Sequence, residues 1–475
     1  MTVALAIILG TIVLATVVGI VAGRSVETTL ESWTVGGRQL GLLLVWLLMA
    51  GEVYTTFIFL GASGWAYGRG APAYYIPIYG TLAYTVSFFL LPVLWRLGKR
   101  HGLHTQPDYF VLRYGSPTLG VMVALLGVVS IVPYLQLQLH GLGLVVEVAS
   151  DGAIGAGAAI ALGFVASCAF VYTSGLKGVA WVAVLKDVLM IAAVAVVGFG
   201  VPYLYFGGFG ATYAAVAERL PGHLVFPGAT TTMGVGWVMS TALLSGLGFY
   251  MWPHLFATAF SARSEAIIRR NAIIMPIYQV PILLVFTVGF AAALVIPGLA
   301  NPDMALLEIV KRTWPPWFLG FVGAAGAVTA MVPAAVLVLG AAALLAKNVI
   351  CPIFLPAAGE ATVMRLSRLL VVAVMGAALL SALLLPGELV GLLILGYDGV
   401  CQLFPGVVLG LAWRRVSRAG VVAGLLTGVG VALALILSGN DPVLGLNAGF
   451  VALAANALVT VVVSLLTRPS EGSLA

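Results

Sequence analysis

Long apolar segments recur along the whole chain, separated by short stretches that carry most of the charged residues. Each apolar segment has about 20 residues or more, which is enough for an α-helix to cross a hydrocarbon core of about 30 Å. Breaks in hydropathy place thirteen spans at residues 2–22, 41–66, 71–95, 118–148, 154–173, 178–206, 233–259, 271–297, 316–346, 364–386, 388–412, 419–437 and 446–467. Several exceed 25 residues, which indicates tilt or interruption. The pattern predicts an all-α polytopic membrane protein rather than a β-barrel, whose strands read as short alternating segments.

Composition supports this prediction, because 62% of the 475 residues are apolar and only 8% are charged. Soluble proteins are about 25% charged, so lipid must face much of this chain. The first span lacks a basic leader and a small-residue cleavage site, which indicates a retained helix rather than a signal peptide. Every segment between spans is short. We therefore expect one transmembrane domain over residues 1–475, without the soluble output domain that a membrane sensor needs.

Basic residues fall mainly on one side of the predicted bundle. With the N-terminus outside, 18 of the 22 Lys and Arg residues lie in inner loops or at inner helix ends. The four outer ones are Arg69, Arg219, Lys311 and Arg312. This asymmetry predicts an outside N-terminus and an inside C-terminus, in a bacterial cytoplasmic membrane. It also explains the net charge of +6 without nucleic-acid binding.

Two spans concentrate glycine or polar residues at their midpoints. One contains "LLMAGEVYTTFIFLG", residues 47–61, and the other "SGLGFYMWPH", residues 245–254, where two glycines and Pro253 disfavour a continuous helix. Interrupted helices in corresponding positions of two halves are typical of secondary transporters with inverted repeats. A charged residue at the bilayer centre costs roughly 2.5–3.5 kcal/mol on insertion scales. We therefore expect Glu52 to face a polar cavity at the first break rather than lipid.

Several motifs identify the chain as a member of the sodium:solute symporter family. They are "WTVGGRQLG" (33–41), "LKDVLM" (185–190), "GLGFYMWPHLFATAFSARS" (246–264) and "QLFPG" (402–406). Within that family, "GEVYTTFIFLG", "KGVAWVAVLKD" and "GFYMWPH" most resemble bacterial monocarboxylate permeases for lactate, pyruvate and similar acids. The resemblance implies a LeuT-like five-plus-five inverted repeat: an extra N-terminal helix and loop (1–40), a ten-helix core (41–412) and two extra C-terminal helices (413–475). Core helices 1 and 6, at 41–66 and 233–259, are then the broken ones.

The resemblance also implies a sodium site, from which this sequence departs. Family members bind sodium between carbonyls of core helix 1, here near Gly51 and Tyr54, and two hydroxyl side chains of core helix 8. The matching stretch, "AVTAMVPAAV" (327–336), lacks oxygen-bearing side chains at those positions, and only Thr329 is a candidate. Hard cations require oxygen ligands. We hypothesise that the Lys186 ammonium stands in for sodium, with Asp187 as its neighbour; the alternative is a lysine extending to the inner interface.

Two further acids lie within predicted spans, where ionisable groups commonly serve ion or proton pathways. Glu52 is either a proton carrier, protonated when an anionic substrate binds, or a structural clasp across the break. Asp398 in core helix 10 is a second proton site or a gate partner, or else an acid that is satisfied by water. His254 follows Pro253, and helix termination explains it structurally.

Candidate substrate contacts surround the two breaks. On core helix 3, Gln136 with His140 and Tyr134 with Gln138 define two different faces, and we favour the face of Gln136 and His140. The substrate-binding candidates are Tyr54, Thr55, Thr56, Gln136, His140, Ser245, Phe249, Tyr250, Trp252 and Gln402. The ion-coupling candidates are Gly51, Glu52, Lys186, Asp187, Thr329 and Asp398. Few polar groups among much aromatic bulk suit a small, partly apolar acid.

These features predict a symporter that imports short monocarboxylates by alternating access, with H⁺ favoured over Na⁺ as the coupling ion. The alternative is sodium-coupled uptake of another small metabolite, such as an amino acid. A channel usually shows subunit symmetry or a repeated filter motif, and an intramembrane enzyme would need a catalytic motif in membrane register; neither is visible. The three cysteines, Cys168, Cys351 and Cys401, are widely spaced and predict packing. We expect no cofactor, no metal site and no obligatory protein partner.

Overall fold

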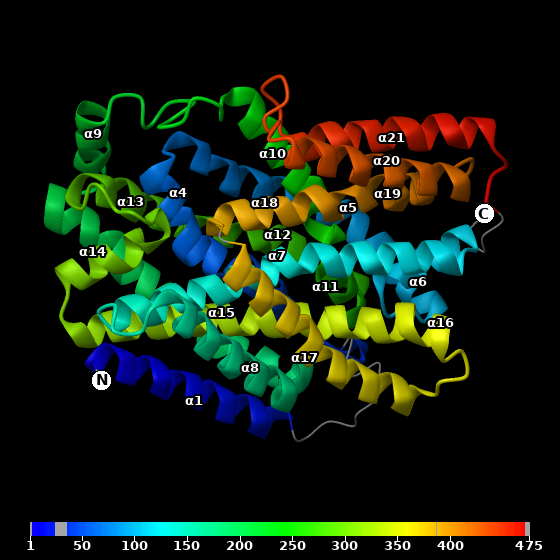
Figure 1. The fold of residues 1–475 in the computed structure, drawn as a ribbon, viewed down its shortest axis with the longest axis horizontal. Helices are drawn as coiled ribbons and strands as arrows, with labels where there is room; N and C mark the ends of the chain where they lie inside the picture. Colours follow the sequence, from blue (N-terminus) through cyan, green and yellow to red (C-terminus); the bar gives the residue numbers. More distant parts are fainter. Residues whose placement is uncertain (1, 24–35, 386, 471–475) are drawn as a thin grey trace.

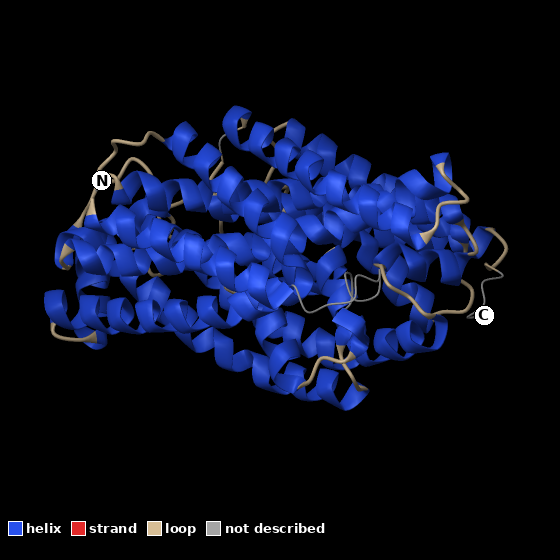
Figure 2. Ribbon diagram, turned by 90° about the horizontal axis from the view of Figure 1, so that it is seen from below, coloured by secondary structure: helices blue, strands red, loops and turns tan. Residues whose placement is uncertain are grey.

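The computed structural model describes residues 2–23, 36–385 and 387–470, apart from the side chains of 23, 36 and 173–177. Helices account for nearly all of this described part, which contains no β-strand beyond two isolated bridges, Leu40 with Ala262 and Val443 with Leu446. Figure 2 shows the same all-helical bundle from a second direction. The first three residues of the "WTVGGRQLG" motif, 33–35, lie outside the described residues.

Ten uninterrupted stretches of the described chain are long and apolar enough to cross a membrane. In chain order they are formed by α1 (Val3–Gly23), η3 with α5 (Ala71–Tyr74, Tyr75–His101), α7 (Pro117–Ala149), the second part of α8 (Ala156–Phe206), α12 to α13 (Glu265–Ile274, Met275–Tyr278, Gln279–Val295), α15 to α16 (Pro316–Leu344, Leu345–Ile350, Cys351–Phe354), α17 (Glu360–Leu384), α18 to α19 (Leu389–Val400, Cys401–Leu403, Phe404–Ala412), α20 (Arg418–Leu437) and α21 (Ala448–Leu466).

The long helix α8 supplies two of the predicted spans, 154–173 and 178–206. Its described parts are a shorter apolar helix, Ala156–Tyr172, and the span Gly178–Phe206. Ile160 packs on Gly143 near one end of α7, and Trp314, just beyond α14 (Ala305–Thr313), packs on Gly200. Lys311 of α14 pairs with Asp151, which follows α7, so both ends of α8 reach the same end of the molecule. The two parts therefore cross in opposite directions.

Two spans are broken where the sequence predicted it. The first, α3 (Leu42–Val53) with η2 and α4 (Phe57–Ala62, Ser63–Gly68), bends by 49°, and the second, α10 with η4 (Val235–Gly248, Phe249–Met251) and α11 with η5 (Pro253–Thr258, Ala259–Ser261), bends by 52°. Trp252 has φ −58° and ψ 127°, as expected because proline pushes the preceding residue out of the helical region. With these two bent spans, each of the thirteen predicted spans has a helical counterpart among the described residues.

The short helices and the first and last spans mark two opposite ends of the bundle. α6 (Gln106–Tyr114), α16 and the end of α21 lie at one end, and α9 (Phe209–Arg219), α14 and the start of α1 lie at the other (Figure 1). We name these the inner and outer ends, after the charge-based orientation. Between them, α15 is the most deeply packed span, surrounded by α1, α7, α8 and α17.

Candidate functional site

The first helix break exposes backbone carbonyls to a buried lysine. The last carbonyls of a helix have no partner within the helix, and here the Lys186 ammonium donates to the carbonyl oxygens of Gly51 at 2.8 Å and Tyr54 at 3.0 Å. Its third neighbour is Asp187 Oδ1 at 3.2 Å. The three ammonium donors therefore each face an oxygen, and Lys186 is completely buried. It does not extend to the inner interface.

The sodium ligands implied by the family and this lysine thus meet at one place. A Cβ added at Gly51 would lie 3.3 Å from Lys186 Nζ, so glycine permits the close approach. The Tyr278 hydroxyl donates to Asp187 Oδ2 at 3.4 Å. Thr329 is buried in α15, and its hydroxyl has no hydrogen-bond partner among the described residues. The arrangement places a fixed cation on the carbonyls that the family pattern assigns to sodium.

A buried contact between a carboxylate and an imidazole joins the two broken helices. Glu52, near the end of α3, lies 3.2 Å from His254 Nε2 at the start of α11, and both side chains are at most 2% exposed. The Tyr134 hydroxyl donates to the Glu52 backbone carbonyl at 3.1 Å. The rings of Trp252 and Tyr134 each lie 6.1 Å from the His254 ring. Helix termination alone therefore does not account for His254, because it pairs with the one carboxylate of α3.

The face of α7 that meets the first break is the one that the sequence analysis did not favour. Gln138 Oε1 accepts hydrogen bonds from the Thr56 hydroxyl at 2.9 Å and the Thr56 amide at 3.4 Å. Gln136 and His140 instead bond the Leu385 and Ala382 carbonyls at the end of α17. The physical reason is that the unpaired carbonyls of a helix end attract polar side chains. Gln136 and His140 therefore lie at the end of α17 rather than at the first break, and their contact with substrate stays a prediction.

Aromatic side chains close over the second break. Phe249 packs against Tyr79, Tyr84 and Tyr250, and Trp252 packs against Tyr134 and Tyr397. The Ser245 hydroxyl is buried in this region without a hydrogen-bond partner among the described residues, and so is Gln138 Nε2 beside the first break. We call the surroundings of the second break, which combine aromatic side chains with a few unpaired polar groups, the aromatic region.

The remaining candidates at the first break hold its shape. The Thr55 hydroxyl accepts from the Phe57 amide at 3.1 Å, at the start of η2. The Tyr54 hydroxyl donates to the Tyr278 carbonyl. Thr55 and Tyr54 thus fix the backbone around the break, with their side-chain oxygens engaged by neighbouring peptide groups.

Gln402 and Asp398 lie elsewhere, at the contact between α18 and α21. Gln402 donates to the carbonyls of Asp398 and Gly449 and accepts from Asn456. Asp398 is buried against Gly449, where an added Cβ would lie 2.1 Å from its Oδ1. The Gln402 amide is therefore engaged by α21 rather than placed at the breaks, and its contact with substrate stays a prediction.

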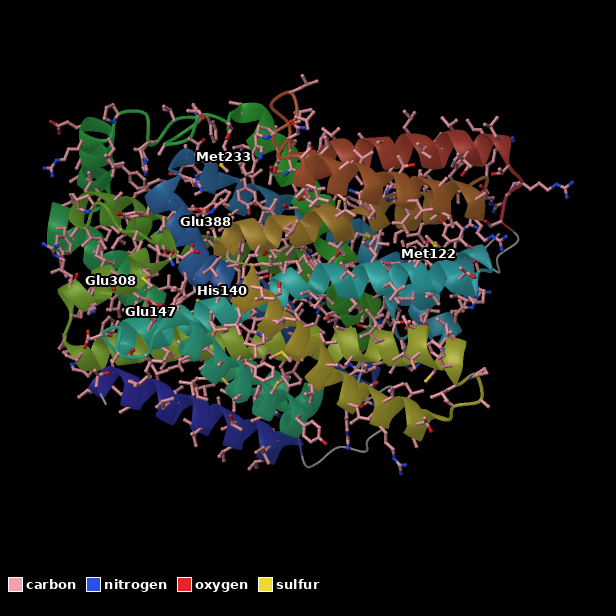
Figure 3. The ribbon with its side chains drawn as sticks, in the orientation of Figure 1. Met122, His140, Glu147, Met233, Glu308 and Glu388 are labelled. Carbon is pink, nitrogen blue, oxygen red and sulfur yellow. The ribbon has the colours of Figure 1, made fainter. Side chains whose placement is uncertain are left out.

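One cavity reaches the second break from the inner end, and another lies toward the outer end. The inner cavity is lined by His254, Pro253, His104, Thr105, Thr258 and Ser261, among others. The outer cavity is lined by His140, Glu147, Asn301 and Glu308, and Figure 3 shows three of these labelled residues toward the outer end.

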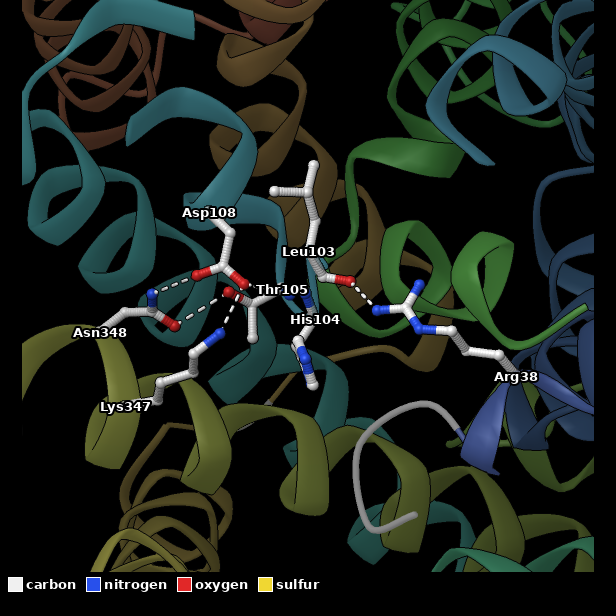
Figure 4. A network of polar contacts seen from close by, with 7 residues as sticks. All are labelled: Arg38, Leu103, His104, Thr105, Asp108, Lys347 and Asn348. Carbon is white, nitrogen blue, oxygen red and sulfur yellow. Dashed lines mark hydrogen bonds and ion pairs between the residues drawn. The ribbon is translucent and has the colours of Figure 1, made fainter. Parts of the chain in front are cut away.

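A network of polar contacts holds the inner end together (Figure 4). Asp108 of α6 accepts from Lys347 at 2.6 Å, from Asn348 at 3.1 Å, and from the amides of His104 and Thr105 at 2.9 Å. Burial alone would raise the pKa of Asp108, but Lys347 and these hydrogen bonds lower it overall. The network therefore keeps its charge at neutral pH and ties α6 to the inner end of α15.

At the outer end, residues flanking α4 and α18 meet. Arg69 and Glu388 form an ion pair at 2.8 Å. Asp303 of η7 (Pro302–Met304) accepts from the Leu389 amide at 2.9 Å and packs on Gly64 of α4. These contacts join the outer halves of two core helices.

Comparisons with known proteins agree with this architecture. The chain is 42% identical to the uncharacterized symporter YhjB of Bacillus subtilis over all of this chain and 99% of that protein. It is 31% identical to a protein named monocarboxylate transport permease of Rhizobium johnstonii, covering 98% and 96% of the two chains.

Solved structures show the same fold. A substrate-bound, outward-open Na⁺-coupled sialic acid symporter matches with a TM-score of 0.82 at 14% identity, over 99% of both chains. A nucleobase-cation-symport-1 transporter in a closed conformation matches with a TM-score of 0.58 at 15% identity, over 94% and 98%. The fold is that of LeuT-like transporters, and these neighbours are transporters rather than enzymes. The sodium:solute symporter family model matches residues 33–428, and the chain belongs to that family.

Proposed function

We propose that this symporter imports short-chain monocarboxylates such as lactate and pyruvate, coupled to protons rather than to sodium. In this proposal it works in a bacterial cytoplasmic membrane, with its N-terminus outside. The observation that carries the coupling proposal is the Lys186 ammonium, which already contacts the Gly51 and Tyr54 carbonyls. A sodium ion at the same carbonyls would lie against this positive charge.

The chemistry around the two breaks supports the substrate class. The side chains there are mainly aromatic, and the unpaired buried groups include the Gln138 amide and the Ser245 hydroxyl. Amide and hydroxyl donors suit a carboxylate, and aromatic walls suit a short carbon chain. The Rhizobium relative that is named a monocarboxylate transport permease, 31% identical along nearly the whole chain, supports the same class.

Proton coupling requires a group that gains and loses a proton during transport. Glu52, Asp187 and Asp398 are buried carboxylates within spans, where ionisable groups commonly serve this purpose. Glu52 lies at the first break and Asp187 beside Lys186, whereas Asp398 lies at the contact with α21. Glu52 and Asp187 therefore lie closer to the first break than Asp398 does, where their charge would act on a bound anion.

Proteoliposomes that are offered labelled lactate or pyruvate under separate gradients test the proposal. We expect saturable accumulation driven by an inward proton gradient without sodium. Accumulation that requires sodium and ignores pH would overturn the coupling proposal, and absence of uptake of every short acid would overturn the substrate proposal. The second candidate is sodium-coupled uptake of another metabolite such as an amino acid, favoured by the family and by the sodium-coupled structural neighbour.

A further inference from the structure

We infer that Glu52 and His254 form one proton-binding site, which exchanges its proton with the inner cavity and whose charge controls binding of an anionic substrate. This inference rests on the proposed proton-coupled uptake of an acid and specifies where the proton is held. The two side chains come from different broken helices, 202 residues apart in the chain, and meet at 3.2 Å in a buried environment. The site therefore bridges the two breaks.

The two halves of the pair have different access. His254 lines the inner cavity together with His104, Thr105 and Thr258, whereas Glu52 does not line it. Neither ring nitrogen of His254 has a hydrogen-bond partner among the described residues, and Nδ1 also lacks the close carboxylate contact that Nε2 makes with Glu52. A proton can therefore pass between the cavity and the imidazole without reaching Glu52 first.

Charge explains how the pair would act on substrate. With one proton bound, a carboxylate and an imidazolium are neutral together, and without it the pair carries one negative charge. The aromatic region lies beside the pair, because Trp252 contacts both Tyr134 and His254. An anionic substrate there is repelled by the unprotonated pair and tolerated by the protonated one, which makes proton binding and anion binding mutually favourable.

The neighbouring titratable groups have other partners. Lys186 of α8 and Tyr278 contact Asp187, and the Tyr134 hydroxyl donates to the Glu52 backbone carbonyl. On α6, Asp108 pairs with Lys347. His104, which precedes α6, lines the inner cavity together with His254. From α15, the close neighbour of His254 is Gly340, and from α12 Asn271 bonds Met49 of α3. The Glu52 carboxylate therefore finds its ionisable partner in His254.

Substitutions at Glu52 separate a proton site from a structural clasp. Glu52→Gln keeps the shape of the side chain and loses its charge, whereas Glu52→Asp keeps the charge and shortens the side chain. In proteoliposomes with labelled pyruvate, we expect E52Q to retain exchange at equal pH within about threefold and to lose gradient-driven accumulation by at least tenfold. His254→Gln leaves the Glu52 charge without its partner, so we expect it to lose both exchange and accumulation. We expect E52D to accumulate more than E52Q. The opposite order, or parallel loss of exchange and accumulation in E52Q, would overturn the proton site.

Two variants outside the site serve as matched controls. The variants are Glu218→Gln and His101→Gln. Glu218 is exposed on α9, and His101 is the last residue of α5. Both should keep exchange and accumulation at the level of the unmodified protein. Loss of accumulation in either variant would show that the assay reports a general effect of removing a titratable side chain, and would overturn the assignment to Glu52 and His254.

A measurement without substrate makes the proton site testable apart from the proposed function. Trp252 lies 6.1 Å from the His254 ring, so protonation of the imidazole should quench its fluorescence. The Trp252 signal is the difference between the protein and its Trp252→Phe variant, recorded in detergent from pH 5 to 9. We expect quenching as pH falls, its loss in H254Q, and a lower midpoint in E52Q. An unchanged titration in H254Q would overturn the inference, whereas a normal titration with no pyruvate transport would overturn only the substrate proposal.

Discussion

At the residue scale, the fully buried Lys186 shows how this chain departs from the sodium pattern that its family implies. Its ammonium reaches two backbone carbonyls and one carboxylate. A buried charge is tolerated when it is paired and hydrogen-bonded, and removal of one partner of such a pair costs roughly 3–5 kcal/mol. Lys186 thus belongs to the structure of the break as well as to its electrostatics.

We expect Lys186→Ala to reduce pH-driven uptake at least tenfold, because the Gly51 and Tyr54 carbonyls and Asp187 lose their shared partner. Uptake of labelled pyruvate in proteoliposomes measures this effect, with purified protein quantified for each variant. Lys99→Ala is the control, since Lys99 is exposed at the inner end of α5. Full pH-driven activity of K186A would end the idea that this ammonium stands in for a coupling cation.

Two glutamines on α7 should behave differently although they are two residues apart. Gln138→Ala removes the unpaired amide beside the first break. Hydrogen bonds to charged groups contribute about 1.5–3 kcal/mol, so we expect KM for pyruvate to rise about tenfold or more. Gln136→Ala removes a contact with the end of α17, so it should lower thermal stability and leave KM nearly unchanged. A rise in KM for Q136A alone would reverse our assignment of the two faces.

At the element scale, the sequence predicted the helices and their breaks well, because each depends on local chemistry. Apolar length located the spans, and glycines with Pro253 located the bends of 49° and 52°. Spacing alone left open which face of α7 meets the break. That choice depends on the unpaired carbonyls at the end of α17, which are more than 240 residues away from Gln136 and His140 in the sequence. The partners of Gln402 and His254 were not predicted for the same reason, since distant helices supply them.

The contact between α20 and α21 depends on glycine. A Cβ added at Gly424 would lie 1.9 Å from Thr460 Oγ1 and 2.8 Å from the Asn456 carbonyl, whereas one at Gly430 would meet nothing within 4 Å. Overpacking costs typically 1–3 kcal/mol. We therefore expect Gly424→Val to lower the melting temperature in detergent and Gly430→Val, on the same helix, to leave it unchanged. Equal melting temperatures for the two variants would contradict this close packing.

The outer contact at Asp303 should respond to pH. Burial raises the pKa of Asp303 to about 7. The nearby charge of Glu388 raises this pKa further, whereas the hydrogen bond from the Leu389 amide and the charge of Arg69 lower it. Below pH 4 the folded and unfolded states both hold this proton, and between about pH 4 and 7 only the folded state does, so stability falls as pH rises through that window. The loss is on the order of 4 kcal/mol for about three pKa units.

Melting temperatures at pH 5 and pH 8 measure this effect. We expect the unmodified protein to melt at a higher temperature at pH 5 than at pH 8, by a margin that shrinks in Asp303→Asn. Glu218→Gln, which changes an exposed acid on α9, should keep the full margin. An equal margin in D303N and in the unmodified protein would show that Asp303 does not hold the proton.

At the scale of the whole molecule, an odd number of spans separates the two chain ends. α1 begins at the end with α9 and α14, and α21 ends at the end with α6 (Figure 1). The fold itself does not assign these ends to the two sides of a membrane, because a five-plus-five inverted repeat has similar architecture in either direction. The assignment rests on charge, because the predicted inner loops and inner helix ends hold 18 of the 22 basic residues.

That asymmetry predicts a measurable topology. Alkaline phosphatase is active only outside the cytoplasm, so its fusion after residue 228 should be active and its fusion after residue 358 inactive. Green fluorescent protein fused at the C-terminus should fluoresce, because it folds in the cytoplasm. The positive-inside rule gives the physical reason, since basic loops are retained on the cytoplasmic side. The opposite pattern of activities would place the cavity lined by His254 on the outside. The pair would then take up its proton from the external medium through that cavity, rather than release it into the cytoplasm.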